Sequence, residues 1–205
     1  MAGRMTAATR PAWQRADGQS TGAGGARTPR PCYAGAMQHK QADAHHPIHD
    51  VIARRWSPYV FADRPVDPAD LRSIFEAARW AASSYNEQPW RWIVATADEA
   101  AEHARLLSCF VEPNQPWARR APVLGLGVAS LRFERNGRDN PAALHDLGLA
   151  AGNLSHEVTA RGLHVHWMIG ILPERARELY AVPGGVLCSD RCQTSTRTPT
   201  TRSTI

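Results

Sequence analysis

The sequence is poor in the features that mark several large protein classes. It has four scattered cysteines, Cys32, Cys109, Cys188 and Cys192, and only Cys109 lies in a segment with apolar periodicity. Cysteines placed in this way do not resemble a disulfide framework, so we expect a reducing cytoplasm. No stretch is long and apolar enough to span a bilayer, and the N-terminus lacks the apolar centre of a secretory signal. We therefore expect no membrane partner.

Nucleotide-binding and hydrolase motifs are also missing. No Gly-x-Gly-x-x-Gly follows a predicted strand, no Gly-x-x-x-x-Gly-Lys occurs, and no serine elbow is present. Rossmann, P-loop and hydrolase interpretations therefore have no support. His164 and His166 alternate along a predicted strand and share a face, which suits two zinc ligands, but nothing completes the four that a structural site needs. A metalloprotein is the weakest of the functional alternatives.

The net charge of +5 lies in the flanks of the 205-residue chain. Residues 1–45 carry +4 and residues 185–205 carry +2, which leaves residues 46–184 at −1. A central part without a strong positive field does not attract a polyanion, so we expect no nucleic-acid partner. The length and the 43% hydrophobic content suit one sizeable core.

Both flanks lack the apolar periodicity of a folded domain. Residues 1–45 are rich in Gly, Ala, Thr, Arg and Pro, a composition that predicts disorder. Their Arg content also resembles a transit peptide, but we favour upstream sequence read as coding, with Met37 as the true start. From Gly185 onward the chain is rich in Ser, Thr and Arg, so residues 185–205 are predicted to be a disordered tail. A frameshift near Gly184 is our hypothesis for this change.

Residues 46–184 alternate between helix and strand patterns. Asp67 and Pro68 are suited to cap and begin a helix. The apolar run 122–129 predicts a strand that is buried on both faces. The Ala- and Gly-rich helix that ends at Gly162 suits a dimer interface, and equally a plain core helix. The predicted helices are 48–56, 68–78, 98–108, 140–161 and 173–180, and the predicted strands are 92–95, 122–129 and 165–170.

The most informative run is the polar turn from Ala82 to Trp90. Ser83 and Ser84 offer hydroxyls and main-chain N–H groups, Asn86 and Gln88 offer paired donor and acceptor edges, and a proline stiffens the exit. Such a turn suits a planar, hydrogen-bonding ligand. An ordinary helix-to-strand connection explains the same composition equally well.

The order of residues in this run resembles a signature of the FMN-dependent nitroreductase family. The matching letters are Ser83-Ser-Tyr-Asn-Glu-Gln-Pro-Trp-Arg-Trp92, preceded by Glu76-Ala-Ala-Arg-Trp-Ala81. Further similar segments are 54–59, 63–67, 121–124, 146–154 and 162–170, so the resemblance covers about residues 46–184. It implies an α+β fold with helices around a central mixed or antiparallel sheet. The family's last strand is expected to be missing, because residues 185–205 lack its apolar pattern and its late basic residue.

The resemblance also implies which residues hold FMN. Arg55 and Ser57 would bind the phosphate, with Arg54 compensating for Tyr59, which stands where the family usually has a second basic residue. The polar turn would lie against the isoalloxazine, with Ala82 where the family commonly has proline. The implied cofactor-binding set is Arg54, Arg55, Ser57, Tyr59, Ser83, Ser84, Asn86, Gln88, Asn114, Trp167, Met168, Ile169 and Gly170.

Plainer explanations exist for the same residues. An Arg-Arg pair at a helix end is also typical of a solvated face. The apolar residues 167–169 also suit core packing, and Asn114 also suits a turn.

The implied function is that of a homodimeric oxidoreductase whose FMN sites lie at the subunit interface. NAD(P)H would reduce FMN and leave, and a nitroaromatic, quinone or similar acceptor would then take the electrons in a ping-pong mechanism. The cofactor carries this chemistry, so we expect no essential side-chain acid or base. The alternative is a non-catalytic remnant or interaction module that has lost tight flavin binding, which Tyr59, Ala82 and the unusual C-terminus favour.

Overall fold

The computed structural model describes residues 40–188 and 196–197. The chain divides into the units Met1–Ala36 and Met37–Ile205, and all described residues belong to the second. The expectations for residues 1–39, including the start at Met37, lie outside the described residues. The same holds for residues 189–195 and 198–205 of the expected tail.

The central sheet is antiparallel, with the strand order β1-β2-β4. β1 (Trp90–Thr96) pairs with β2 (Val123–Ser130) from Trp90↔Ala129 to Thr96↔Val123. β4 (Val186–Cys188) covers the other edge of β2. Every residue of β2 from Val123 to Ala129 is buried, so the prediction of a strand that is covered on both faces is confirmed.

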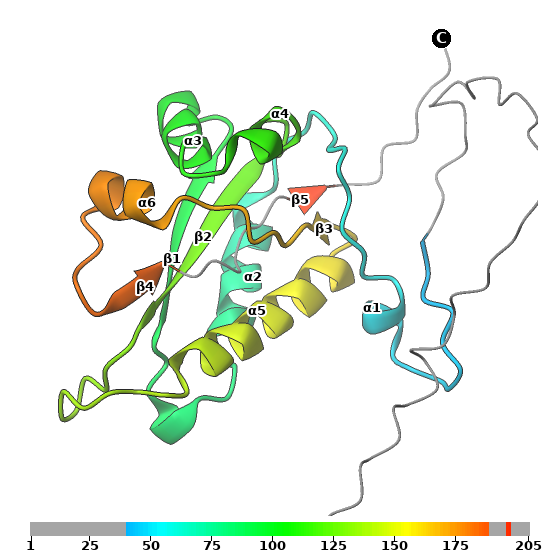
Figure 1. The fold of residues 1–205 in the computed structure, drawn as a ribbon. Helices are drawn as coiled ribbons and strands as arrows, with labels where there is room; N and C mark the ends of the chain where they lie inside the picture. The colour runs from blue at the N-terminus through cyan, green and yellow to red at the C-terminus, as the bar shows by residue number, and fades with distance from the viewer. Residues whose placement is uncertain (1–39, 189–195, 198–205) are drawn as a thin grey trace, which may run out of the picture. The chain divides into compact units, whose positions relative to one another are not determined.

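Helices cover both faces of this sheet (Figure 1). Leu124, Leu126 and Val128 pack into one core with α3 (Ala100–Leu107), α4 (Gln115–Ala118) and α6 (Pro173–Tyr180). The opposite face carries small residues of β2, and there α2 (Pro68–Arg79) and α5 (Ala143–Ala160) form the second core. The structure therefore confirms an α+β fold with helices around a central sheet.

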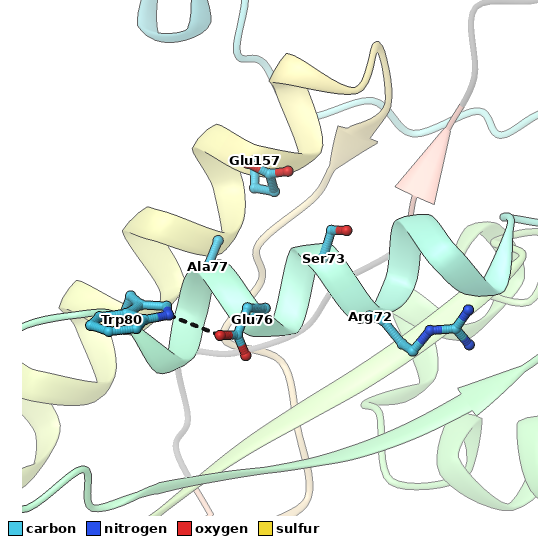
Figure 2. Close-up of a pocket in the computed structure, with 6 residues that line it drawn as sticks. All are labelled: Arg72, Ser73, Glu76, Ala77, Trp80 and Glu157. Atoms are coloured by element: carbon cyan, nitrogen blue, oxygen red, sulfur yellow. Dashed lines mark hydrogen bonds between the residues drawn. The ribbon is translucent and has the colours of Figure 1, made fainter.

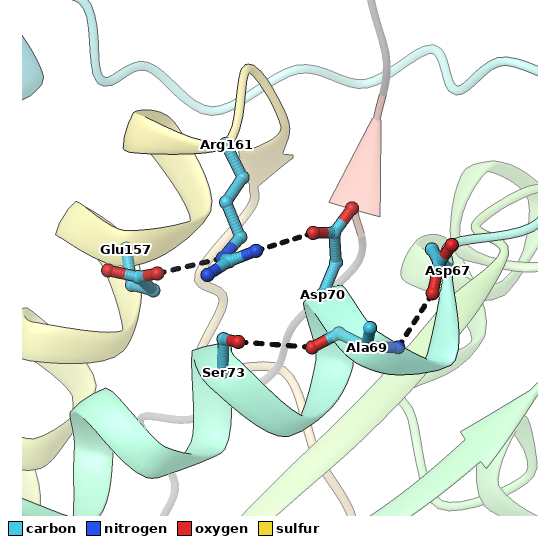
Figure 3. A network of polar contacts seen from close by, with 6 residues as sticks. All are labelled: Asp67, Ala69, Asp70, Ser73, Glu157 and Arg161. Carbon is cyan, nitrogen blue, oxygen red and sulfur yellow. Dashed lines mark hydrogen bonds and ion pairs between the residues drawn. The ribbon is translucent and has the colours of Figure 1, made fainter.

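Local signals set the two helices of the second core. Asp67 caps α2 as predicted, because its Oδ1 accepts the main-chain N–H of Ala69 at 2.7 Å. Gly162, at φ +70°, follows the last turn of α5 and ends it. Arg161 then ties the two helices together, donating to Asp70 at 2.6 Å and to Glu157 at 2.7 Å (Figure 3).

Three predictions about elements were wrong. The helix expected from Ile48 is reduced to α1 (Asp50–Ala53), and the face expected to be buried is open, with Ile48 44% and Ile52 48% exposed. Pro58 disfavours helical geometry at Ser57, so it limits how far a helix could extend, but it does not explain an end as early as Ala53. The strand expected over 165–170 is limited to β3 (His164–Val165), which pairs with β5 (Thr196–Arg197). Ordered structure also extends past residue 184, because β4 lies in the expected tail.

None of the helices in the described part of the chain is long and apolar enough to cross a membrane.

Candidate functional site

The polar turn after α2 forms a tight 3-10 turn, η2 (Ser84–Asn86). Tyr85, Asn86 and Gln88 have φ angles of 54°, 55° and 49°, in the left-handed region that residues with a Cβ rarely occupy. Ser83 Oγ accepts the main-chain N–H of Gln88 at 3.0 Å, which closes the turn. We call the six residues from Ser83 to Gln88 the loop 83–88. Its positive φ angles give it a specific and strained conformation.

A hollow of about 660 Å³ lies beside the loop 83–88. It falls within the size range of small-molecule sites. The side chains of Asn86 and Gln88 line it and bond to each other, with Gln88 Nε2 donating to Asn86 Oδ1 at 3.0 Å. Its other lining residues are Phe75, Arg79, Glu87, Trp90, Arg91, Trp92 and Val94.

The segment 54–59 offers one arginine in a partly enclosed setting. Arg55 is half-buried and its Nη1 lies 3.4 Å from Ser57 Oγ, so these two predicted phosphate ligands are neighbours, whereas Arg54 is exposed. Tyr59 is 63% exposed, and its ring lies 5.3 Å from that of Trp117 and 4.6 Å from that of His166.

His166 joins this segment to the one that follows β3. Its Nδ1 lies 2.9 Å from the carbonyl oxygen of Pro58, which can only accept, so Nδ1 carries the hydrogen. The imidazole is buried, and burial lowers its pKa below the ordinary value because the charged form loses its hydration. His166 is thus held as a neutral ring that fixes the chain at Pro58.

The segment 167–170 does not form the strand that was expected, and its side chains point to different surroundings. Trp167 Nε1 donates to Ser155 Oγ at 2.6 Å, Met168 is buried, and Ile169 is 67% exposed. At Gly170 the chain meets Asn114, whose Nδ2 lies 3.5 Å from the glycine carbonyl oxygen. The two predicted residues Asn114 and Gly170 are therefore in contact.

The predicted residues fall into groups near different ends of α5. Ser84 contacts Asp146 in the first turn of this helix, whereas the predicted Tyr59 lies with Pro58 and His166 near the strand that follows its last turn. Eighteen residues of α helix span about 27 Å. Figure 1 shows the loop after α2 beside the start of α5, and the chain after α1 beside its end. One chain does not bring all the predicted residues together.

Three contact residues near the site were not among those predicted. Asp146 is 2% exposed and accepts the main-chain N–H of Ser84 at 2.9 Å through Oδ2. Trp117 and His166 form the aromatic group around Tyr59. An acidic residue in the first turn of a predicted helix is a usable sign for Asp146, but helix starts favour acids generally.

A second, more open hollow of about 540 Å³ runs along α2 and α5 and contains none of the predicted residues (Figure 2). Glu76 lies in it, and hydrogen bonds from Arg79 and then Trp80 lower the pKa of Glu76 to about 2. The Glu76 carboxylate already accepts hydrogen bonds from Arg79 and Trp80 at the end of the same helix. No group of three or more possible metal ligands occurs among the residues that the structure describes.

Comparison with known proteins gives consistent matches. The model of the nitroreductase family matches residues 52–189. A Streptomyces coelicolor protein named as an NADH dehydrogenase/NAD(P)H nitroreductase is 41% identical over 78 residues, which are 38% of this chain and 38% of that protein. The major NAD(P)H-flavin oxidoreductase of Aliivibrio fischeri is 34% identical over 98 residues, which are 46% of this chain and 44% of that protein. The matches thus cover less than half of these curated relatives.

Solved structures agree on the fold. A crystal structure of an oxidoreductase containing FMN superposes with a TM-score of 0.71 at 28% identity, over 77% of this chain and 79% of that one. A nitroreductase family protein from Clostridium novyi superposes with a TM-score of 0.62 at 19% identity, over 74% of this chain and 84% of that one.

Proposed function

This chain belongs to the nitroreductase family, and from that premise we propose that it is an FMN-dependent NAD(P)H oxidoreductase. The observation that carries the proposal is the loop 83–88, whose amide side chains line a hollow large enough for a planar ring. The relatives that carry flavin or NAD(P)H in their names support the same cofactors. FMN held there would supply the redox chemistry that connects oxidation of NAD(P)H to reduction of an acceptor in a ping-pong cycle.

The residues present fit this cofactor at both of its ends. Arg55 presents a planar set of donors next to the Ser57 hydroxyl, which suits phosphate oxygens. Asn86 and Gln88 present amide edges, which suit the acceptors and donors of the isoalloxazine rim. Packing within the chain requires glycine at position 170, because a Cβ there would overlap Asn114 and Val111, and this packing keeps the Asn114 amide beside the main chain of the segment 167–170.

The separation of these two ends supports a homodimer. Along the open face of α5, Leu144 is 45% and Leu149 40% exposed, and a Cβ at Gly148 or Gly152 would meet nothing within 4 Å. Exposed leucines beside glycines let a second helix approach closely. If α5 packs against the same helix of a second copy in antiparallel fashion, the loop 83–88 of one copy comes near Arg55 of the other, which gives a self-complementary interface.

Nitroaromatic compounds, quinones and similar flat electrophiles are the acceptors that we propose. A hollow lined by Phe75, Trp90 and Trp92 favours planar, apolar molecules, and the exposed Arg79 and Arg91, which also line it, favour electron-rich oxygens. No side chain among the described site residues has to act as a general acid or base, because the cofactor carries the reaction.

The test is the colour of the purified full chain. We expect a flavin absorbance spectrum that NADPH or NADH bleaches without oxygen and that a quinone restores. A chain that takes up no FMN, even when the apo protein is titrated with it, contradicts the proposal. That result would favour the second candidate, a non-catalytic remnant, for which the absence of charge at Tyr59 and of proline at Ala82 are the supporting observations.

A further inference from the structure

We propose that Asp146 is a positioning residue, whose buried carboxylate fixes the loop 83–88 in its flavin-binding conformation by accepting the main-chain N–H of Ser84. The inference rests on the proposed function, since that function assigns the loop to the flavin. The inference goes beyond that function, because it makes the geometry of the loop depend on Asp146, a residue outside the loop.

The carboxylate of Asp146 is placed for this task. It lies in the first turn of α5, is 2% exposed, and reaches across 62 residues of sequence to Ser84 N at 2.9 Å from Oδ2. Its Oδ1 lies 3.0 Å from Nδ1 of His145, whose side chain is 72% exposed. A buried carboxylate is unfavourable unless hydrogen bonds replace its water, and the amino end of a helix also favours negative charge. The Ser84 N–H is therefore one of the groups that keep this charge in place.

The loop needs such an anchor because its backbone is unfavourable by itself. Tyr85, Asn86 and Gln88 all have positive φ, and none is glycine. Tyr and Gln lack the short polar side chain by which Asn and Asp bond to nearby backbone in the left-handed region, so this geometry persists only when the surroundings hold it. Asp146 holds the residue that immediately precedes these three.

The other contacts of the loop lie at its exposed side, and they come from the segment that precedes α5 and from Arg91, whose Nη1 donates to Gln88 O at 3.0 Å. The main-chain N–H of Glu134 donates to Glu87, and Tyr85 is 74% exposed between the ring of Phe133 and the guanidinium of Arg135. Exposed contacts of this kind are weaker anchors than a buried, charged hydrogen bond. The bond to Asp146 also uses only the main chain of Ser84, so the serine hydroxyl is not the group that Asp146 binds.

Substitutions on both sides of the bond test the role. Asp146→Ala removes the acceptor, and Asp146→Asn keeps one carbonyl oxygen. Ser84→Pro removes the donor, and the extended backbone of Ser83, at φ −148° and ψ 156°, suits a residue that precedes proline. Ser84→Ala removes only the hydroxyl and keeps the N–H. Thr159→Val is the matched control on the same helix, because Thr159 is 2% exposed and its hydroxyl bonds within α5, to Ser155 O at 2.9 Å.

The first measurement is amide hydrogen exchange of the loop peptide in the chain without flavin. We expect exchange to become faster by about tenfold or more in Asp146→Ala, as for the loss of a hydrogen bond to a charged group. Asp146→Asn should be intermediate, and Thr159→Val should match the wild type. An unchanged exchange rate in Asp146→Ala overturns the role. If Asp146→Ala does not fold, unchanged exchange rates in both Asp146→Asn and Ser84→Pro overturn it.

The second measurement is FMN affinity. Asp146→Ala and Ser84→Pro should each weaken binding by about tenfold, and the double variant should be no weaker than either, because both remove the same bond. Additive losses contradict the inference. A wild-type chain that binds no FMN overturns the proposed function instead, and hydrogen exchange then still decides whether Asp146 fixes the loop.

Discussion

Gly170 and Asn114 approach so closely that a side chain at position 170 would overlap the Asn114 amide. A Cβ built on Gly170 would collide with Asn114 Nδ2 and would lie 2.7 Å from Val111 Cγ2. Gly170→Ala is therefore expected to displace the Asn114 side chain and to lower the free energy of unfolding by about 1–3 kcal/mol, as for other overpacked sites. Chemical denaturation of the chain without flavin measures this loss.

The double variant Gly170→Ala/Asn114→Ala provides the control for that prediction. Removing the amide takes away the nearer obstacle, so the double variant should lose less stability than the sum of the two single variants. The contact with Val111 remains, so recovery should be partial. Additive losses would show that the overlap with Asn114 is not the cause.

Arg55 is predicted to recognise the phosphate of FMN rather than its ring. Arg55→Gln should weaken FMN binding by about 10- to 100-fold, because a hydrogen bond to a charged group is lost, and should leave riboflavin binding unchanged. Titration of the apo chain with each flavin, followed by fluorescence quenching, measures both affinities. Arg72→Gln is the matched control, since Arg72 is exposed on α2 and lines the other hollow. Equal losses for FMN and riboflavin would refute a phosphate-specific role.

The elements predicted correctly from the sequence are those that neighbouring residues specify, through a helix cap, a proline or a continuous apolar run. Asp67 and Pro68 mark the start of α2 through capping and a fixed φ angle, which depend only on neighbouring residues. α6 was predicted over 173–180 and is found there. The continuous apolar run of β2 also correctly indicates burial on both faces.

The prediction of a strand over 165–170 was wrong because of what an apolar pattern can show. Such a pattern indicates which side of a segment could be buried, but not whether another strand is available to pair with it. Its main chain leaves the ladder where Gly170 O accepts from Val111 N, and Trp167 bonds to Ser155 on α5. These partners lie in other elements, so no window of sequence contains the information.

For the candidate site, the sequence supplied the types of side chain but not their arrangement. Seryl and amide groups in the loop 83–88 could be recognised, whereas the positive φ of Tyr85 could not, because it depends on contacts from a distant helix. The burial of Asp146 was hidden for the same reason. The division of the predicted residues between the two ends of α5 became visible only in the fold.

His166 is predicted to make stability depend on pH. Burial lowers its pKa in the folded chain, so as the pH falls below the ordinary value of about 6.5 the unfolded state takes up a proton that the folded state resists. The contribution of His166 to the free energy of unfolding is therefore fully present above that value, and it decreases as the pH falls toward the lowered pKa. His166→Asn keeps an N–H donor for the Pro58 carbonyl but does not titrate. Unfolding midpoints at about pH 7.5 and 5.5 should differ less in the variant than in the wild type.

The open face of α5 is predicted to be where two copies of the chain meet. Gly148→Arg places a long, charged side chain in a space where a Cβ meets nothing of its own chain within 4 Å, so the single chain should keep its fold. Replacing a glycine inside a helix should even raise helix stability by about 0.5–1 kcal/mol. If a second helix packs on this face, the buried charge should separate the copies, and FMN affinity should decrease because each site draws on both. Gly184→Arg is the matched control, since position 184 is equally open but lies between α6 and β4. Light scattering should give a dimer for the wild type and for Gly184→Arg, and a monomer for Gly148→Arg; a dimer for Gly148→Arg with unchanged FMN affinity would place the contact on another face.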